Sequence, residues 1–332
     1  MAKVAINGLG RIGRATLKVV LQTPDLELVA VNDIANPENI AYLIKYDTVY
    51  GRFGNDVTAK DGKLTIDGKS FDFLSERDPA NLPWKKLNVD IVFESTGFFT
   101  EKEGASKHVE AGAKFVIISA PTKSEDLPTI VHGVSGTDNH AQIISCASCT
   151  TNSITPVVEV IGRHFGIQKA ILTTIHGYTA SQSLVDGPHA KFRRGRAGAA
   201  NLVPTSTGAA IATTKALPEY SGKFDGVSVR VPVPVGSISD LVFLTEKNTT
   251  EQEINQVLTK ESATDRYREV MRVTTDPIVS SDIIGDTHAA IIDAEMTKVV
   301  DGNLVKIFSW YDNEWGYTNQ MVRRAQLIAQ SL

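Results

Sequence analysis

Residues 3–14, KVAINGLGRIGR, carry the pattern that predicts the fold of the first half of this 332-residue chain. A β-rich run leads into Gly8, Gly10 and Gly13, which form the pattern G-x-G-x-x-G where a helical segment opens. In such a turn the first glycine permits a tight bend, the second lets the backbone approach a pyrophosphate, and the third allows close packing of helix on strand. The unpaired N–H groups at the helix N-terminus favour a phosphate there.

The second β-rich run, residues 26–33, ends at Asp33, twenty residues after Gly13. A carboxylate at this spacing accepts hydrogen bonds from the adenosine ribose hydroxyls, whereas it repels a 2′-phosphate. The turn and the carboxylate together predict a dinucleotide site that prefers NAD to NADP. A glycine-rich turn without a ligand is the alternative.

The two halves of the chain differ in the pattern of their β-rich runs. In the first half, short runs at 90–97, 114–121 and 142–148 alternate with helix-compatible segments, which predicts a doubly wound, Rossmann-type parallel sheet. The second half has longer runs, which predict an α+β domain with a mostly antiparallel sheet. These longer runs are 170–178, 226–235, 239–246, 288–295 and 304–312.

The domain boundary is predicted near residue 148. We expect a dinucleotide-binding domain over residues 1–148 and a catalytic domain over 149–312. The C-terminal helix, about residues 313–332, places four apolar residues on one face and is expected to dock back on the first domain. These residues are Met321, Ala325, Ile328 and Leu332.

Composition and charge argue against several function classes. The net charge is −4, so the chain as a whole is not drawn to nucleic acid or to an anionic membrane. No apolar run approaches the ~20 residues that span a bilayer, and the first residues lack the layout of a secretory signal. Two cysteines, Cys146 and Cys149, are too few for a disulfide framework. We expect a cytoplasmic protein.

Cys149 lies where a β-rich run passes into the apolar, helix-compatible run that follows Asn152. A thiol at a helix N-terminus is stabilised as thiolate by the dipole, which favours a nucleophile. Three alternatives stay open: an inert buried thiol, a redox pair with Cys146, and a zinc site. The zinc site is disfavoured because no second cysteine pair would complete it.

His176 is the second catalytic candidate. It ends the run ILTTIH and precedes a long irregular stretch that bears glycine and arginine, and such stretches tend to be functional. A histidine beside the thiol could hold it as thiolate and act as general acid and base. A purely structural histidine is the alternative.

At this point the chain resembles the phosphorylating glyceraldehyde-3-phosphate dehydrogenases over nearly its whole length. The resemblance rests on many motifs in order rather than on one. They are INGLGRIGR (6–14), KYDTVYGRF (45–53), SCTTN (148–152), HGYT (176–179), RRGRA (193–197), VPTSTGAA (203–210), VRVPVP (229–234) and WYDNEWGY (310–317).

The resemblance implies a two-stage mechanism and a set of site residues. Cys149 would attack the aldehyde of glyceraldehyde 3-phosphate, His176 would take the hydroxyl proton as hydride passes to NAD, and inorganic phosphate would attack the thioester. The phosphates would be bound by Ser148, Thr150, Thr179, Arg194, Thr207, Gly208 and Arg230. The cofactor would be bound by Gly8, Gly10, Arg11, Ile12, Gly13, Asp33, Arg77, Ser119 and Asn313.

The family implies a homotetramer in which the loop bearing Lys191, Arg193, Arg194 and Arg196 packs on a neighbouring subunit. A nucleic-acid patch is the less favoured interpretation of this basic loop, because the chain as a whole is acidic. No metal is expected.

Three positions depart from the family pattern. Ser181 stands where an aspartate is common, Gly187 where a bulky apolar residue is common, and Cys146 where an asparagine is common. They leave open the substrate affinity, the tolerance for NADP and a disulfide between the two cysteines. The competing functions are erythrose-4-phosphate dehydrogenase, which hydrolyses its thioester, and a non-catalytic binding or adhesive role.

Overall fold

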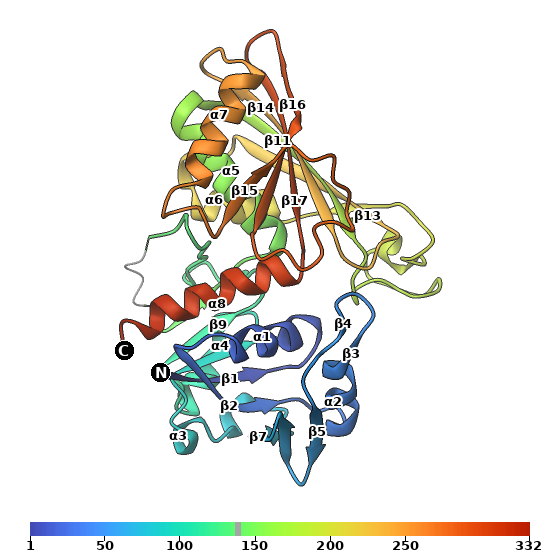
Figure 1. Cartoon of the computed structure of the whole chain (residues 1–332), viewed down its shortest axis with the longest axis vertical. Helices are drawn as coiled ribbons and strands as arrows, with labels where there is room; N and C mark the ends of the chain where they lie inside the picture. Colours follow the sequence, from blue (N-terminus) through green and yellow to red (C-terminus); the bar gives the residue numbers. More distant parts are fainter. Residues whose placement is uncertain (137–140) are drawn as a thin grey trace. The chain divides into compact units, whose positions relative to one another are not determined.

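The computed structural model describes residues 1–136 and 141–332. The chain divides into two compact units (Figure 1). The first unit comprises Met1–His132, Gly136–Ala147 and Met321–Leu332. The second comprises Gly133–Ser135 and Ser148–Gln320.

The first unit is built on an eight-stranded sheet with the order β10-β9-β8-β1-β2-β7-β6-β5. From β10 to β7 every neighbouring pair is parallel, which confirms the predicted doubly wound sheet. The antiparallel pairs β5–β6 and β6–β7 extend it at one edge. The strands are β1 (Ala2–Asn7), β2 (Leu26–Asn32), β5 (Val57–Lys60), β6 (Lys63–Ile66), β7 (Lys69–Leu74), β8 (Ile91–Glu94), β9 (Phe115–Ile118) and β10 (Ile143–Ser145).

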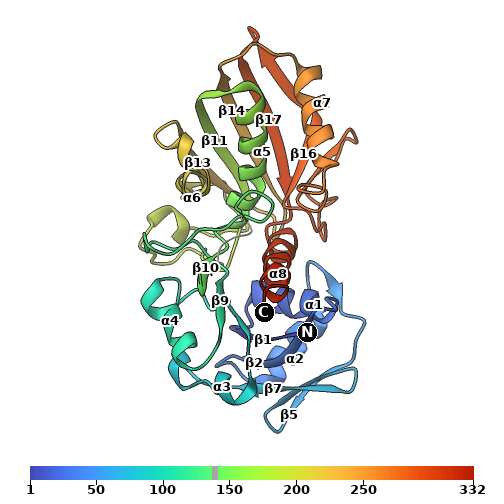
Figure 2. The same cartoon turned by 90° about the vertical axis from the view of Figure 1, so that its left-hand side faces the viewer.

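The strand order of the first sheet reverses between β1 and β8. The chain leaves β1 toward β2 on one side and later leaves β8 toward β9 on the other, so right-handed crossovers place α1 and α4 on opposite faces (Figure 2). Ligands of such sheets bind at the carboxyl ends of the strands at this reversal. The smaller elements are α1 (Arg11–Leu21), α2 (Pro37–Lys45), β3 (Tyr46–Asp47), β4 (Gly51–Arg52), η1 (Pro79–Asn81), α3 (Trp84–Leu87) and α4 (Lys102–Glu110).

The second unit is built on a seven-stranded sheet with the order β12-β13-β11-β14-β17-β16-β15. Four of its neighbouring pairs are antiparallel, and β11–β13 and β15–β16 are parallel. The predicted mostly antiparallel sheet is therefore confirmed. The strands are β11 (Ile167–Gly177), β12 (Val203–Ser206), β13 (Phe224–Val231), β14 (Ser237–Thr245), β15 (Met271–Thr274), β16 (Ala290–Val300) and β17 (Leu304–Tyr311).

Helices α5 and α7 pack on one face of this second sheet (Figures 1 and 2). The apolar core between them includes Ile154, Val158, Leu241 and Ile254, each essentially inaccessible to solvent. A capping box begins α7, because the Thr250 hydroxyl accepts from the N–H of Glu253 and the Glu253 carboxylate accepts from the Thr250 N–H. The remaining elements are α5 (Cys149–Phe165), η2 (Phe192–Gly195), α6 (Ala209–Ala216), η3 (Pro218–Tyr220), α7 (Glu251–Ser262) and α8 (Trp315–Ala329).

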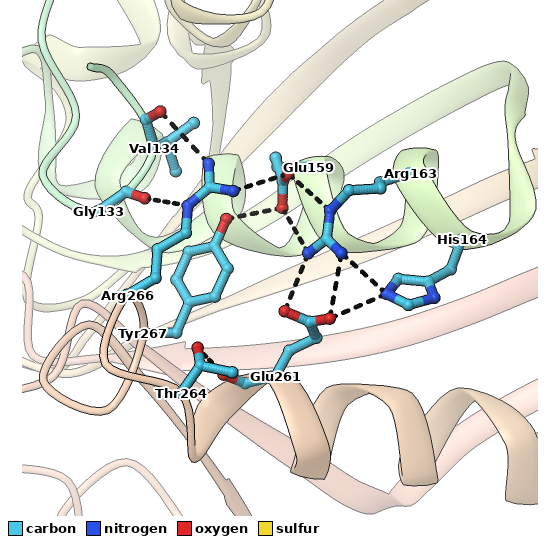
Figure 3. Close-up of polar contacts among 9 residues, drawn as sticks. All are labelled: Gly133, Val134, Glu159, Arg163, His164, Glu261, Thr264, Arg266 and Tyr267. Atoms are coloured by element: carbon cyan, nitrogen blue, oxygen red, sulfur yellow. Dashed lines mark hydrogen bonds and ion pairs between the residues drawn. The ribbon is translucent and has the colours of Figure 1, made fainter.

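A cluster of charged side chains joins the second half of α5 to the end of α7 (Figure 3). Arg163 binds Glu159 one turn earlier at 2.9 Å and Glu261 of α7 at 2.9 Å. Glu159 also accepts from the Tyr267 hydroxyl at 2.7 Å and pairs with Arg266 at 3.1 Å. This cluster, called the helix-end ion cluster below, fixes the far end of the helix that begins at Cys149.

Candidate active site

The glycine-rich turn has the geometry that its sequence predicts. Gly8 has φ +91°, and a Cβ there would lie 2.7 Å from the backbone nitrogen of Thr96. A Cβ on Gly13 would lie 1.9 Å from the Gly8 carbonyl oxygen, so a glycine is needed at this position for α1 to pack on β1. A Cβ on Gly10 would meet nothing within 4 Å, which leaves this part of the backbone open to a ligand.

A cleft of about 540 Å³ opens beside this turn, within the first unit. Four of the predicted cofactor residues line it: Gly8, Gly10, Asp33 and Arg77. Several further lining residues were not predicted, although the run STGFF, residues 95–99, which directly follows β8, was a signal for some of them. They are Asn7, Asn32, Ile34, Glu76, Ser95, Thr96, Phe98 and Phe99.

The Asp33 carboxylate is held at the end of β2 by backbone donors. Its Oδ2 accepts from the N–H of Leu9 at 2.6 Å, and its Oδ1 accepts from the N–H of Ala35 at 2.9 Å. Each oxygen keeps a lone pair for a further donor. The predicted ribose-binding carboxylate is thus directly tied to the glycine-rich turn.

Three other predicted cofactor residues lie at the start of a helix or directly after a strand. Arg11 begins α1, but its guanidinium forms an ion pair with Asp47 at 2.6 Å. Burial acts to raise the pKa of Asp47, while hydrogen bonds from Arg11 and from two backbone N–H groups outweigh it, so the pKa lies below its usual range. Ile12 follows in the first turn of α1, and Ser119 follows β9, where its N–H donates to the Glu94 carbonyl oxygen at 2.9 Å.

Cys149 is the first residue of α5, and Ser148 is its N-cap, whose hydroxyl accepts from the N–H of Thr151 at 3.1 Å. The helix is continuous through Pro156. The Cys149 Sγ lies 3.4 Å from Nε2 of His176 on β11. The structure therefore brings the two predicted catalytic side chains into hydrogen-bonding distance.

The neighbours of His176 determine which ring nitrogen carries its proton. Nδ1 lies 2.7 Å from the carbonyl oxygen of Gly177, which can only accept a hydrogen bond. Arg230, paired with His176 in the β11–β13 register, lies 2.9 Å from the same nitrogen and 3.1 Å from the same carbonyl. We assign the proton to Nδ1, which donates to the nearer carbonyl oxygen, so the Arg230 guanidinium donates to that carbonyl and not to Nδ1. Nε2 is then the acceptor that faces the Cys149 thiol.

Burial and positive charge set the protonation of this pair. Burial raises the pKa of the Cys149 thiol, while the Arg230 guanidinium acts in the opposite direction. Burial, with Arg230 adding to it, lowers the pKa of His176 to about 3. The helix dipole was expected to favour a thiolate, whereas the enclosed position of the sulfur opposes it. A neutral imidazole that can take the thiol proton follows from the geometry.

The predicted phosphate-binding residues are spread over loops and helix ends of the second unit. Thr179 bonds the Ser181 hydroxyl at 2.9 Å, and the Arg194 Nε donates to the hydroxyl of Thr205 at 3.0 Å. Thr207 accepts from the N–H of Ala209, beside Gly208, the N-cap of α6. Burial lowers the pKa values of Arg194 and Arg230.

A buried tyrosine below the cysteine was missed by the sequence analysis. The Tyr311 hydroxyl lies 2.8 Å from the Thr150 hydroxyl and 2.7 Å from that of Thr174, and burial raises its pKa to about 12. The Thr150 side chain is therefore directed into the core rather than toward a phosphate. One residue of this hydrogen-bonded group, Thr174, could have been found from the sequence. It lies two residues before His176 and therefore on the same face of its strand.

Asn313 and Cys146 complete the set of candidates. Asn313 accepts from the N–H of Gly236 at 3.0 Å and from the Ser237 hydroxyl at 2.9 Å, both through Oδ1. Cys146 and Cys149 are free thiols, and burial raises the pKa of Cys146 to about 12.

Among the described residues, His, Cys, Asp and Glu form no group of three suited to a metal. Over the same part of the chain, every helix is too short or too polar to span a bilayer.

Comparison with known proteins identifies the family of this chain. Residues 2–102 match the family described as glyceraldehyde 3-phosphate dehydrogenase, NAD binding domain, and residues 148–313 match its C-terminal domain. The chain is 48% identical over 334 residues to glyceraldehyde-3-phosphate dehydrogenase 2 of Streptomyces avermitilis, covering 99% of each chain. It is 47% identical over 330 residues to the Geobacillus stearothermophilus glyceraldehyde-3-phosphate dehydrogenase, covering 98% of each. The chain belongs to the glyceraldehyde-3-phosphate dehydrogenase family.

Proposed function

We propose that this chain catalyses the oxidative phosphorylation of glyceraldehyde 3-phosphate to 1,3-bisphosphoglycerate with reduction of NAD. The observation that carries the proposal is the 3.4 Å approach of the Cys149 Sγ to Nε2 of His176 at the start of α5. A nucleophile beside a base whose other nitrogen is fixed by a carbonyl is the arrangement that covalent acyl chemistry uses.

In the first stage, the Cys149 sulfur adds to the aldehyde carbon and the thiol proton passes through His176 to the carbonyl oxygen. Nε2 then takes the hydroxyl proton back as the carbon loses hydride and becomes a thioester. NAD, when bound, supplies the hydride acceptor. The backbone N–H of Cys149 at the helix start stabilises the oxygen while it is negative.

In the second stage, inorganic phosphate attacks the thioester carbon. The carbon–sulfur bond breaks, the acyl phosphate leaves, and Cys149 is reprotonated from His176. Two anion subsites are needed. We assign the substrate phosphate to Thr179 and Arg230, with Arg194 nearby, and the attacking phosphate to Ser148, Thr207 and Gly208, because guanidinium, hydroxyl and helix-start N–H groups suit phosphate oxygens.

The residues of the first unit fit NAD. The cleft joins an open backbone at Gly10 to the Asp33 carboxylate, which favours a ribose with a free 2′-hydroxyl. We propose that Arg77 and Ser119 bind along the dinucleotide and that Arg11 contributes its backbone N–H, since its side chain is paired with Asp47. The Asn313 Oδ1 is already bonded, so its NH₂ would face the nicotinamide carboxamide.

The decisive experiment measures initial rates with glyceraldehyde 3-phosphate, with and without inorganic phosphate, using NAD and NADP in parallel. NADH formation that depends on phosphate supports the proposal. Phosphate-independent turnover, or faster turnover of erythrose 4-phosphate, would favour erythrose-4-phosphate dehydrogenase, and the absence of turnover would favour a binding role. The rates with NADP test whether a glycine at position 187 allows NADP to be used as the cofactor.

We further propose a homotetramer, a cytoplasmic location, and domains over residues 1–148 and 149–312 with the C-terminal helix returning to the first. The grouping of Met321–Leu332 with the first unit supports the domain assignment. Exposed apolar side chains on β11 and β13 and in the neighbouring loop support assembly with further copies of this chain. They are Ile171 (58% exposed), Phe192 (88%) and Val227 (53%). Light scattering of the purified protein would give the oligomeric state.

A further inference from the structure

A continuous chain of hydrogen bonds runs beneath the dinucleotide cleft, across the carboxyl ends of four neighbouring strands. It is called the strand-end network below, and it lies wholly within the first unit. None of its side chains was assigned a role above. Its members are Trp84 of α3, His108 of α4, Glu94 and Thr96 at the end of β8, Asn7 of β1, Asn32 of β2 and the backbone of Glu76 after β7.

The hydrogen bonds at one end of the network fix the tautomer of His108. The indole N–H of Trp84 can only donate, and it reaches Nδ1 of His108 at 2.9 Å. Nδ1 is therefore an acceptor, and the imidazole proton lies on Nε2. Nε2 in turn donates to Oε2 of Glu94 at 2.9 Å. Both side chains are fully enclosed, with exposed fractions of 0% for His108 and 1% for Glu94.

The Glu94 carboxylate is satisfied entirely by donors. Oε2 accepts from His108 and from Nδ2 of Asn7 at 2.6 Å, while Oε1 accepts from the N–H of Thr96 at 2.8 Å and from its hydroxyl. Because a carboxylate only accepts, the amide of Asn7 must present its NH₂ to Glu94 and its oxygen to the opposite side.

The side-chain amide of Asn7 is linked by hydrogen bonds to the ends of the next two strands. Its Oδ1 accepts from Nδ2 of Asn32 at 2.7 Å. Asn32 then has its Oδ1 free to accept from the N–H of Glu76 at 2.9 Å, and its second amide hydrogen reaches the Glu76 carbonyl at 2.9 Å. The Glu94 carboxylate at one end and the Glu76 backbone at the other thus fix the same orientation for the side-chain amides of Asn7 and Asn32.

The network supports the cleft from below. Four of its members, Asn7, Asn32, Glu76 and Thr96, also line the cleft. Gly8 and Asp33, the residues expected at the pyrophosphate and the ribose, directly follow Asn7 and Asn32 in the chain. We propose that Glu94, oriented by His108, is the positioning residue of the dinucleotide site. It acts through the two asparagines and sets the separation of the turn at Gly8 from the carboxylate of Asp33.

The proposal rests on NAD being the cofactor, and its test is Glu94→Gln, which exchanges one oxygen for an NH₂. In either orientation the new NH₂ meets donors, from Asn7 and His108 on one side or from Thr96 on the other. We expect the Kd for NAD, and for ADP-ribose as a probe, to rise about 10-fold in calorimetric titrations of the folded protein, the effect of one buried bond lost. KM for NAD should rise in parallel, with kcat at saturating NAD and KM for the aldehyde within about 2-fold of wild type.

Asp90→Asn is the matched control. Asp90 precedes β8 at its opposite end, where it accepts from the N–H of Lys3 at 2.8 Å and pairs with Lys114 at 2.7 Å. The same chemical change there removes a charge beside the same strand, at the end opposite Glu94. It should lower the melting temperature and leave the Kd for NAD within about 2-fold.

Trp84→Phe is a second variant that leaves the carboxylate intact. Removing the indole N–H frees Nδ1 of His108 to take the proton, and we expect the Kd for NAD to rise about 3-fold. An unchanged Kd in folded Glu94→Gln would overturn the proposal, as would an unchanged Kd in Trp84→Phe if Glu94→Gln does not fold. Wild-type protein that does not bind NAD would instead contradict the proposed function.

Discussion

The two units hold the ionisable groups of their sites in different ways. In the first unit the carboxylates of Asp33 and Glu94 each meet donors on both oxygens. In the second, the pKa values of Cys149, His176 and Arg230 are all displaced by burial. Within the described residues, the buried Nε of Arg230 and both amide atoms of Gln182 have no hydrogen-bond partner.

This difference matches the work that each unit performs. A binding cleft gains affinity when its groups are already positioned by their own hydrogen bonds, because little order is lost on binding. A reacting site needs groups whose pKa values are shifted from their ordinary range. Unpaired donors such as the Arg230 Nε can also bind anionic substrates. Variants of the second unit should therefore affect chemistry, whereas variants of the first should affect cofactor affinity.

The largest effect is expected from Cys149→Ser. A hydroxyl has a far higher pKa than a thiol, so nucleophilic attack fails, and turnover should fall by more than about 10³-fold. The Kd for NAD, which depends on the first unit, should stay within about 2-fold. Cys146→Ala is the control, because this buried thiol touches no reacting atom in the proposal, and its activity should be preserved. Equal losses in both variants would contradict the assignment of the nucleophile.

The next effect is expected from His176→Asn, which removes the acceptor that faces the thiol. Loss of a positioned base costs about 10²- to 10⁴-fold in kcat. Iodoacetamide alkylation of Cys149 should also slow at neutral pH, because no neighbour then takes the thiol proton. Measuring the alkylation rate separately from turnover shows whether His176 acts on the sulfur itself. An unchanged alkylation rate would place its role only in the later hydride step.

A smaller effect on cofactor choice is expected from Asp33→Gly in the first unit. It removes the carboxylate that would repel a 2′-phosphate and that holds the N–H of Leu9. The ratio of kcat/KM for NADP to that for NAD should rise about 10-fold, with kcat for NAD changed less than KM. A fall in kcat for NAD without any change in KM would break the proposed division between the units.

The sequence predicts those parts of the two sites that depend on neighbouring residues, and it does not predict the parts that depend on contacts between distant ones. Gly8, Gly13 and Asp33 were predictable because steric and charge requirements of a βαβ turn act over a few neighbouring residues. His176 could be named, but its approach to Cys149 depends on how β11 lies beside α5, which no local pattern encodes. Tyr311 and the strand-end network were missed because their partners are far apart in the chain, as with Asn7 and Glu94, separated by 87 residues.

The smallest effect tests a cluster that should serve neither site. Hydrogen bonds from Arg163 and then His164 lower the pKa of Glu261, in the helix-end ion cluster, to about 2, against the opposing effect of burial. The unfolded chain, with a glutamate pKa of about 4.3, binds this proton first. The stabilisation is therefore complete above about pH 5 and is lost as the pH falls toward 2. Because Arg163 is 43% exposed, solvent screening reduces the contribution to about 1 kcal/mol.

Glu261→Gln should accordingly lower the free energy of unfolding at pH 7 by about 1 kcal/mol and flatten its dependence on pH between about 5 and 2. Denaturant titrations at several pH values would measure both. Asp265→Asn is the control, since Asp265 is 94% exposed in its pair with Arg268 and should contribute almost nothing. Because the cluster contacts neither the cleft nor the thiol, kcat and the Kd for NAD at pH 7 should be unchanged. A fall in kcat would show instead that the fixed far end of α5 helps to place Cys149 at its beginning.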